Sequence, residues 1–192
     1  MTQLVGAIAQ VAVFALVPLA WWLQAGRPEG SFPRWLGFRA AKGAGGTAVL
    51  AATVTCGLGF FASALFAGPS AWTMTGEPFA MLLAIALAAL IQTALSEELF
   101  FRGFLLNWLG AKRTGPVVAN LVQALACGLV RMAGHWVFVD RELTPCLAAL
   151  ALGAGSAFLA GWVKQDTGSL LLPWAAHGAG NLIAGLVAVV TR

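Results

Sequence analysis

The chain has 192 residues, of which 60% are hydrophobic and only 9% are charged. An average soluble domain carries about 25% charged residues, so this chain has too few charges to cover a surface that faces water. Its net charge of +4 comes from basic residues between apolar blocks, without the basic face and interleaved aromatic residues of a nucleic-acid-binding protein. Composition therefore excludes a soluble protein and a nucleic-acid partner, and it makes the lipid bilayer the expected surrounding.

Six apolar blocks follow one another along the chain, each near the roughly 20 residues that a membrane span requires. Because backbone groups must be hydrogen-bonded within lipid, spans are helices or closed barrels, and uninterrupted runs rich in Ala and Leu exclude the barrel. We therefore predict an all-α fold, a single transmembrane domain over residues 1–192 that forms a bundle of about six helices. The predicted spans lie at about residues 4–25, 43–67, 79–106, 115–138, 145–164 and 168–190.

Basic residues between the blocks predict the orientation of the bundle. The second connection carries no Lys or Arg, and the fourth carries only Arg141. The other three connections are predicted to face the cytoplasm, which places both termini outside. We expect an integral protein of a bacterial inner (plasma) membrane. The basic residues of the first, third and fifth connections are Arg27, Arg34, Arg39, Lys42, Lys112, Arg113 and Lys164.

A few polar side chains fall at predicted membrane depth. An ionisable residue there costs about 2.5–3.5 kcal/mol on insertion scales, so each one needs a partner or a purpose. Both histidines of the chain belong to this group. The candidate site residues are Glu97, Glu98 and Arg102 in the third block, Arg131 and His135 in the fourth, and His177 and Asn181 in the sixth.

Helical spacing sorts these candidates. Glu98 and Arg102 are four residues apart on one face, which suits an ion pair, whereas Glu97 points about 100° away and is expected to lack that partner. His177 and Asn181 also share a face, so Asn181 is expected to orient the imidazole or to bind the same substrate atom. Glu97 and His177 both lie about 15 Å below the predicted cytoplasmic surface, so they can face each other.

This set of residues has the chemistry of peptide hydrolysis. A carboxylate that lipid and protein shield from bulk water can act as a general base on a water molecule. An opposed imidazole and amide can stabilise the oxyanion that develops on a peptide carbonyl. We therefore expect an intramembrane endopeptidase that cleaves near the cytoplasmic side of the membrane.

Two segments resemble motifs of the CAAX-protease and bacteriocin-processing (CPBP, Abi-type) family. Residues 96–104 resemble its E-E-x-x-x-R motif, and residues 167–181 resemble its H-x-x-x-N motif with the Thr-Gly-Ser-Leu lead. The catalytic motifs lie in about residues 79–190, and the resemblance covers roughly the last 115 residues. It implies a glutamic intramembrane endopeptidase that processes a peptide or protein substrate at the membrane, by CAAX-type cleavage, C-terminal processing or sorting. It further implies that Glu97 activates the water, that Glu98 and Arg102 support the site, and that His177 and Asn181 hold the oxyanion.

The middle motif of the family, F-x-x-x-H, matches this chain in two ways, each with one residue changed. One alignment places Arg131 at the Phe and His135 at the His. The other places Cys127 at the Phe and Arg131 at the His. His135 is then either catalytic or an interfacial histidine beside Trp136. Arg131 is expected to pair with Glu97 or Glu98, to bind a substrate carboxylate, or to extend toward the nearer surface.

A metal site remains an alternative, because two His and a Glu from different helices can in principle bind zinc. No H-E-x-x-H pair is present, and Arg131 is a poor neighbour for a cation, so we favour a mechanism without metal or other cofactor and leave zinc open. Cys56, Cys127 and Cys146 are odd in number and match no metal-ligand spacing, so we predict small packing residues.

Two other interpretations compete with catalysis. The charged residues of the third block can form a buried salt-bridge cluster that only fixes helix packing, and His177 with Asn181 can supply interhelical hydrogen bonds. The chain would then be a catalytically silent membrane protein of the same fold that acts in self-immunity or as a partner. A small transporter is a third possibility, although the paired halves and broken helices of many transporters are absent from the sequence.

Overall fold

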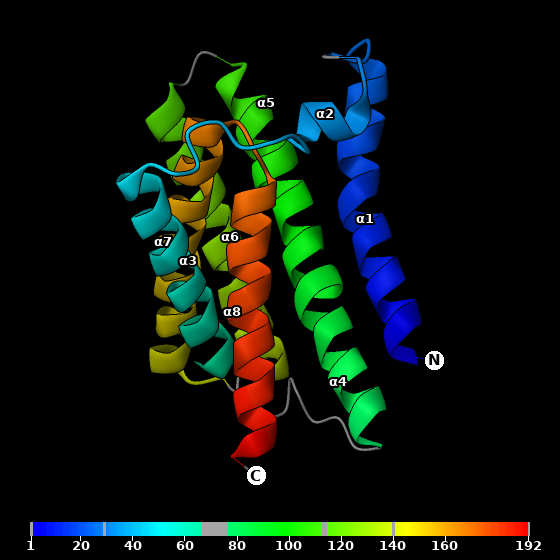
Figure 1. The fold of residues 1–192 in the computed structure, drawn as a ribbon, viewed down its shortest axis with the longest axis vertical. Coiled ribbons are helices and arrows are strands. Elements are labelled where there is room, and N and C mark those ends of the chain that lie inside the picture. The colour runs from blue at the N-terminus through cyan, green and yellow to red at the C-terminus, as the bar shows by residue number, and fades with distance from the viewer. Residues whose placement is uncertain (1, 29, 67–76, 113–114, 140, 192) are drawn as a thin grey trace.

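The apolar blocks fold into helices, as the sequence predicts (Figure 1). The structure, a computed structural model, describes residues 2–28, 30–66, 77–112, 115–139 and 141–191; Arg113 and residue 67, which the predictions used, lie outside this part. Six helices are long and apolar enough to cross a membrane, and no strand occurs among the described residues, so the all-α class is confirmed. The long helices are α1 (Thr2–Gln24), α3 (Thr47–Phe66), the helix Pro78–Gly110, α6 (Pro116–Phe138), α7 (Leu143–Thr167) and α8 (Leu171–Val190).

The helix Pro78–Gly110 departs from the prediction in geometry and length. It ends at Gly110 rather than near residue 106. Two stretches have the wider π-helical turn, with i→i+5 hydrogen bonds, and π turns are rare and often mark functional sites. α-Helical turns were predicted throughout this segment, and the two π stretches correct that geometry. Its parts are α4 (Pro78–Ala86), η2 (Leu87–Leu95), η3 (Glu98–Leu105) and α5 (Leu106–Gly110).

The first connection contains a short helix that the sequence did not predict, α2 (Phe32–Leu36). It ends at Gly37, whose φ of 105° favours glycine. The carbonyl oxygen of Gly37 accepts a hydrogen bond of 2.8 Å from the backbone N–H of Leu170, between α7 and α8. Trp35 of α2 stacks on Trp21 of α1 with ring centroids 5.2 Å apart. The first connection is therefore hydrogen-bonded to the α7–α8 turn and packed against α1.

The segment Thr167–Leu170 sets where α8 begins. Gly168, with φ of 69°, ends α7. The Ser169 hydroxyl donates to the carbonyl oxygen of Arg39 at 2.6 Å and accepts the backbone N–H of Leu171 at 3.2 Å. The Thr-Gly-Ser-Leu segment thus ends α7, precedes α8 and bonds to the first connection. This contact fixes where α8 begins and therefore the position of His177 along the bundle.

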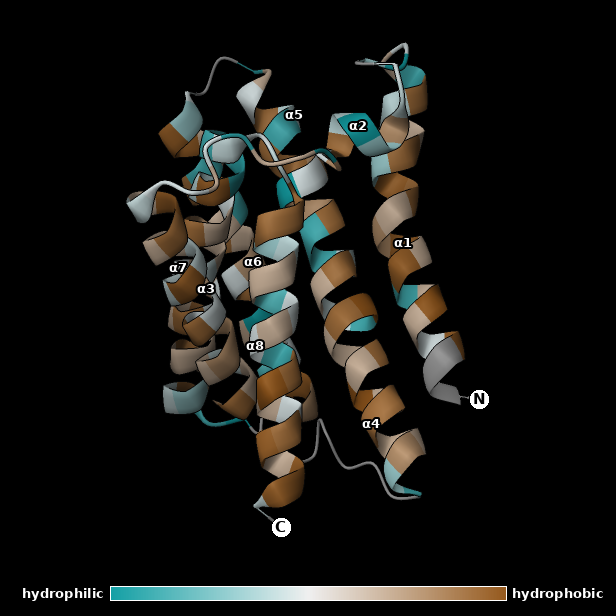
Figure 2. Cartoon of the chain, in the orientation of Figure 1, coloured by the Kyte–Doolittle hydropathy of each residue, from teal (hydrophilic) through white to brown (hydrophobic). Residues whose placement is uncertain are grey.

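The helices pack side by side along one direction (Figure 1). α3 lies against both α7 and α8, α6 packs on α7, and η2 lies against α8, while α1 packs on η2 and η3. Both termini lie at one end, and α2, α5 and the basic connections lie at the other (Figure 1). Figure 2 shows apolar residues over most of each long helix and hydrophilic residues in the middle of α8. Which end faces the cytoplasm stays a prediction.

Glycines bring α3 and α8 into close contact. A Cβ added at Gly180 would lie 2.9 Å from the backbone nitrogen of Phe61, and one at Gly57 would lie 3.2 Å from the carbonyl oxygen of Ala176. Small residues of this kind let two membrane helices approach closely. These contacts hold α3 and α8 in a fixed register, which also fixes the positions of the side chains between the two helices.

Candidate active site

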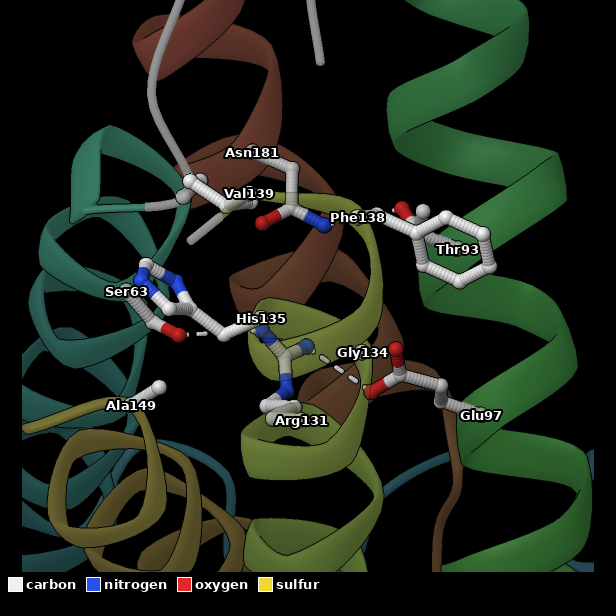
Figure 3. Close-up of a pocket in the computed structure, with 11 residues that line it drawn as sticks. Ser63, Thr93, Glu97, Arg131, Gly134, His135, Phe138, Val139, Ala149 and Asn181 are labelled. Atoms are coloured by element: carbon white, nitrogen blue, oxygen red, sulfur yellow. Dashed lines mark hydrogen bonds and ion pairs between the residues drawn. The ribbon is translucent and has the colours of Figure 1, made fainter. Parts of the chain in front are cut away.

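Polar side chains from four spans meet at a pocket of about 260 Å³ between α3, the η2–η3 junction, α6 and α8 (Figure 3). Glu97 lies at the junction itself, and Oε2 of its carboxylate is 3.9 Å from Nε2 of His177. The prediction that Glu97 and His177 face each other is confirmed. The pocket is lined by Ser63, Ala64, Thr93, Glu97, Arg131, Gly134, His135, Phe138, Val139, Ala149 and Asn181.

Arg131 of α6 lies between the two facing groups. Its Nη2 is 2.8 Å from Oε2 of Glu97 and 2.8 Å from Nε2 of His177. Its Nη1 donates to the hydroxyl oxygen of Ser63 on α3 at 3.1 Å. Figure 3 shows the guanidinium and the Glu97 carboxylate pointing toward one another. Arg131 therefore pairs with Glu97, which is one of the partners predicted for it.

The imidazole of His177 is oriented by Glu98. Nδ1 lies 3.0 Å from Oε1 of Glu98, and both side chains are fully buried. Because a guanidinium only donates, Nε2 of His177 must accept from Arg131, and Nδ1 therefore carries the proton and donates to Glu98. The two neighbours of the ring together select one tautomer.

The position of Asn181 excludes one of the two roles predicted for it. Its Nδ2 donates to the hydroxyl oxygen of Thr93 at 2.9 Å, and no hydrogen bond joins Asn181 to His177 within the described residues. Thr93 in turn donates to the carbonyl oxygen of Ala88 at 2.9 Å. Asn181 thus does not orient the imidazole, and its amide lies at the pocket (Figure 3).

Glu98 and Arg102 form the predicted ion pair, which is confirmed at 3.0 Å with both side chains fully buried. Cys127 of α6 lies beside this pair, with its Sγ 3.9 Å from Nη1 of Arg102 and 3.8 Å from Oε2 of Glu97. Cys127 is a buried packing residue, as predicted, but it also contacts the charged groups. The spacing of the cysteines held no sign of this second contact.

The face of α6 that meets Glu97 carries Cys127 and Arg131, one turn apart. His135 lies one turn further toward the end of α6, is buried and lines the pocket. This placement agrees with the alignment that puts Cys127 and Arg131 at the Phe and His of the middle motif. His135 borders the pocket, and Arg131 takes the position between the facing groups.

Two residues of α3 touch the site although sequence reasoning passed over them. The ring of Phe60 stacks on His177 with centroids 3.7 Å apart and planes 10° from parallel. Ser63 accepts from Arg131, as described above. A single Ser or Phe in an apolar helix is usually a packing residue or bonds its own backbone, so no local signal marks either one. Thr93 precedes Glu97 by four residues, a spacing that could have drawn attention to it.

The pocket extends toward the end of the bundle where α3 and α6 finish, since Ser63, Phe138 and Val139 line it. Both chain termini lie at this same end (Figure 1). From the sequence, both termini are predicted to face outward and cleavage is predicted near the cytoplasmic side. These two expectations do not fit together for a site at this pocket, because the pocket extends toward the end that holds the termini.

Among the described residues, no group of three or more His, Cys, Asp and Glu side chains is gathered in a way that could hold a metal ion. The guanidinium of Arg131 lies between the carboxylate of Glu97 and the imidazole of His177. This guanidinium would repel a second cation placed beside it.

A family model described as Type II CAAX prenyl endopeptidase Rce1-like matches residues 78–183, more than half of the chain. The matched segment runs from the start of α4 into α8 and contains every candidate site residue predicted from the sequence. It leaves α1, α2 and α3 outside. No curated protein and no solved structure matches the chain.

Proposed function

Because the chain belongs to the Rce1-like type II CAAX prenyl endopeptidase family, we propose that it cleaves a peptide bond near the C-terminus of a membrane-associated protein by glutamate-activated water. The family is one of CAAX-type intramembrane endopeptidases, which act on proteins or peptides at a membrane. The observation that carries the proposal is the position of Glu97, at a pocket and opposite His177 and Arg131. An all-helical set of spans favours a plasma or bacterial inner membrane, since outer-membrane proteins are barrels.

Glu97 is the general base of this mechanism. Its Oε2 accepts from Arg131, and we assign its other carboxylate oxygen, Oε1, to the water molecule. A water molecule held there loses a proton to Glu97 as its oxygen attacks the carbonyl carbon of the scissile bond. The tetrahedral intermediate then breaks its C–N bond, and Glu97 returns the proton to the leaving nitrogen. Atoms and charges balance over these reaction steps.

Arg131 and Asn181 supply the donors for the oxyanion. A guanidinium has five N–H groups, so Arg131 can keep its bonds to Glu97 and Ser63 and still offer a donor to the pocket. The Asn181 amide has a second N–H besides the one that Thr93 accepts. Donors held in place before the reaction stabilise developing charge without reorganisation.

His177 has a different part in this proposal from the one that the family resemblance implies. Its Nε2 accepts a hydrogen bond from Arg131, so that nitrogen has no proton to give to an oxyanion in this arrangement. We assign His177 and Glu98 to holding Arg131, and Arg102 to balancing the buried charge of Glu98. Burial of a carboxylate without such a partner would be costly.

The proposal is tested by cleavage in proteoliposomes. The probe is an internally quenched peptide that ends in an S-farnesylated CAAX sequence, and the products are identified by mass spectrometry. We expect the parent to cleave, and Glu97→Gln, Arg131→Ala and His177→Ala to lose activity at equal membrane levels. Retained activity in Glu97→Gln would refute the glutamate mechanism.

A second candidate function is that of a silent member of the family, which acts as a partner or in self-immunity. The observation that favours it is the ion pair of Arg131 with Glu97, which compensates the charge of the expected base. Under this alternative the double variant Cys127→Phe, Arg131→His, which restores the middle motif, gains cleavage that the parent lacks. Cleavage by the parent rejects the alternative.

A further inference from the structure

Helix α3 lies outside the segment that the family model matches, yet it contacts the site at two points one turn apart. Phe60 and Ser63 are three residues apart and share one face of the helix. Phe60 is fully buried, and Ser63 is buried and lines the pocket. Their shared face is turned toward Arg131 and His177.

The ring of Phe60 touches three polar groups of the site at once. It stacks on the His177 imidazole at 3.7 Å and within 10° of parallel. The Cζ atom of Arg131 lies 5.0 Å from the ring centroid, and that of Arg102 lies 5.6 Å from it. The negative face of an aromatic ring attracts a guanidinium, most strongly where water is excluded. Phe60 therefore restrains the plane of the imidazole and the position of two cations together.

Ser63 adds a directional contact to this restraint. Its hydroxyl oxygen accepts from Nη1 of Arg131 at 3.1 Å, while Nη2 of the same guanidinium faces Glu97 and His177. A planar guanidinium bound through both Nη atoms cannot rotate without losing a bond. The hydroxyl thus fixes the direction in which Arg131 points.

The backbone of α3 is held firmly enough to position these side chains. The close approaches at Gly57 and Gly180 fix α3 against α8, which carries His177. On its other side Phe60 packs with Cys56 and with Ala160 of α7. The rings of Phe60 on α3 and His177 on α8 therefore have little freedom to move apart.

We propose that the face of α3 bearing Phe60 and Ser63 is a positioning element of the active site, which sets the plane of His177 and the direction of the Arg131 guanidinium. This inference rests on the proposed function for its consequence on rate. Phe60 does not line the pocket, so its loss should lower kcat and leave KM unchanged. Leu in its place keeps an apolar side chain but removes the ring.

The first arm of the test needs no catalytic activity. The chain has only two histidines, so selective ¹³C,¹⁵N-histidine labelling of the protein in micelles gives two imidazole signals, which His135→Ala assigns. We expect the His177 ring protons of the parent to be shifted upfield by the stacked Phe60 ring, and its Nδ1 to be protonated. In Phe60→Leu the upfield shift should disappear. The control Phe61→Leu alters the next residue, which packs against a different cluster, and should leave His177 unchanged.

The second arm measures rate on the farnesylated peptide. Phe60→Leu should lower kcat about tenfold or more at unchanged KM, the scale expected when reacting groups lose alignment. Ser63→Ala should also lower kcat, and Ser63→Thr, which keeps the hydroxyl, should restore it. If the parent does not cleave, the proposed function fails while the imidazole signals still decide the positioning role. Parent-like His177 signals in folded Phe60→Leu, or an unchanged kcat, would overturn the inference.

Discussion

Oε1 of Glu98 lies 3.0 Å from Nδ1 of His177, so a carboxylate from the η3 segment holds the imidazole of α8. The same oxygen lies 3.0 Å from Nη1 of Arg102. Its neighbour Glu97 faces the pocket instead, with a side chain that is 13% exposed. Two adjacent glutamates therefore have separate tasks, one in holding the site together and one in chemistry.

Replacement of these two glutamates should affect stability very differently. Glu98→Gln leaves the fully buried Arg102 without a compensating charge, so we expect the free energy of unfolding to fall by about 3–5 kcal/mol. Glu97→Gln should cost clearly less, because Glu97 and Arg131 are both partly exposed at the pocket. Chemical denaturation in mixed micelles measures both. Equal losses would contradict this division of tasks.

Arg131→Lys should lower kcat by about 100-fold or more, the scale seen when one donor of an oxyanion site is removed. A lysine ammonium is a single point of charge and cannot bond Glu97, His177 and Ser63 at once. The measurement is cleavage of the quenched farnesylated peptide. Arg141→Lys, an exposed exchange of the same kind, is the control and should match the parent. A rate for Arg131→Lys within about threefold of the parent would count against a role in catalysis.

The two histidines should separate kinetically. His135 borders the pocket, so His135→Ala should mainly change KM, with kcat within about threefold of the parent. His177→Ala removes a partner of both Glu98 and Arg131 and should lower kcat by about 100-fold. Steady-state kinetics over a range of peptide concentrations distinguishes the two. The reverse pattern would favour the alignment that places His135 at the histidine of the middle motif.

The orientation of the bundle decides from which side substrate enters. Cys56, Cys127 and Cys146 are all buried, so a membrane-impermeant maleimide should leave the parent unlabelled in intact cells. The charge pattern predicts that Arg141→Cys is labelled from outside and that Arg34→Cys is labelled only after the membrane is permeabilised. The pocket would then open to the outside. The opposite labelling would place the pocket on the cytoplasmic side, where CAAX-type substrates are expected.

A pair of glycines on α7 tests the packing beneath the site. A Cβ at Gly161 would lie 2.6 Å from Nε2 of Gln123 and 2.9 Å from Cγ of Asn120 on α6, and overpacking of this kind costs about 1–3 kcal/mol. Gly155, with nothing within 4 Å of its added Cβ, should tolerate alanine or gain slightly from helix propensity. Thermal unfolding of Gly161→Ala and Gly155→Ala measures the difference. Equal midpoints would show that α6 and α7 adjust freely.

The spans could be predicted because the bilayer requires the same long apolar run wherever a helix crosses it. The polar residues within these runs could also be predicted as site candidates, because ionisable side chains are rare in an apolar span. Helix α2 was not predicted, because a helix of five residues is too short to show a helical periodicity. The π turns on either side of Glu97 could not be predicted, because backbone hydrogen-bond spacing depends on packing against neighbouring helices and not on local composition.

Contacts between different spans were harder to predict from the sequence than contacts within one helix. The sequence shows that Glu98 and Arg102 share a face, because both lie on one helix. It does not show that Arg131 reaches Glu97, or that Phe60 covers His177, because those contacts depend on how separate helices turn toward one another. Three expectations for Arg131 stayed open for this reason, and only the packed bundle selects among them.

One guanidinium joins four spans: Arg131 belongs to α6 and bonds Ser63 of α3, Glu97 between η2 and η3, and His177 of α8. During biosynthesis these spans enter the membrane one after another, and α8 is the last to leave the ribosome. A nascent or truncated chain that already carries Glu97 therefore has no assembled site. Entry of α8 into the membrane is therefore the step that completes the site.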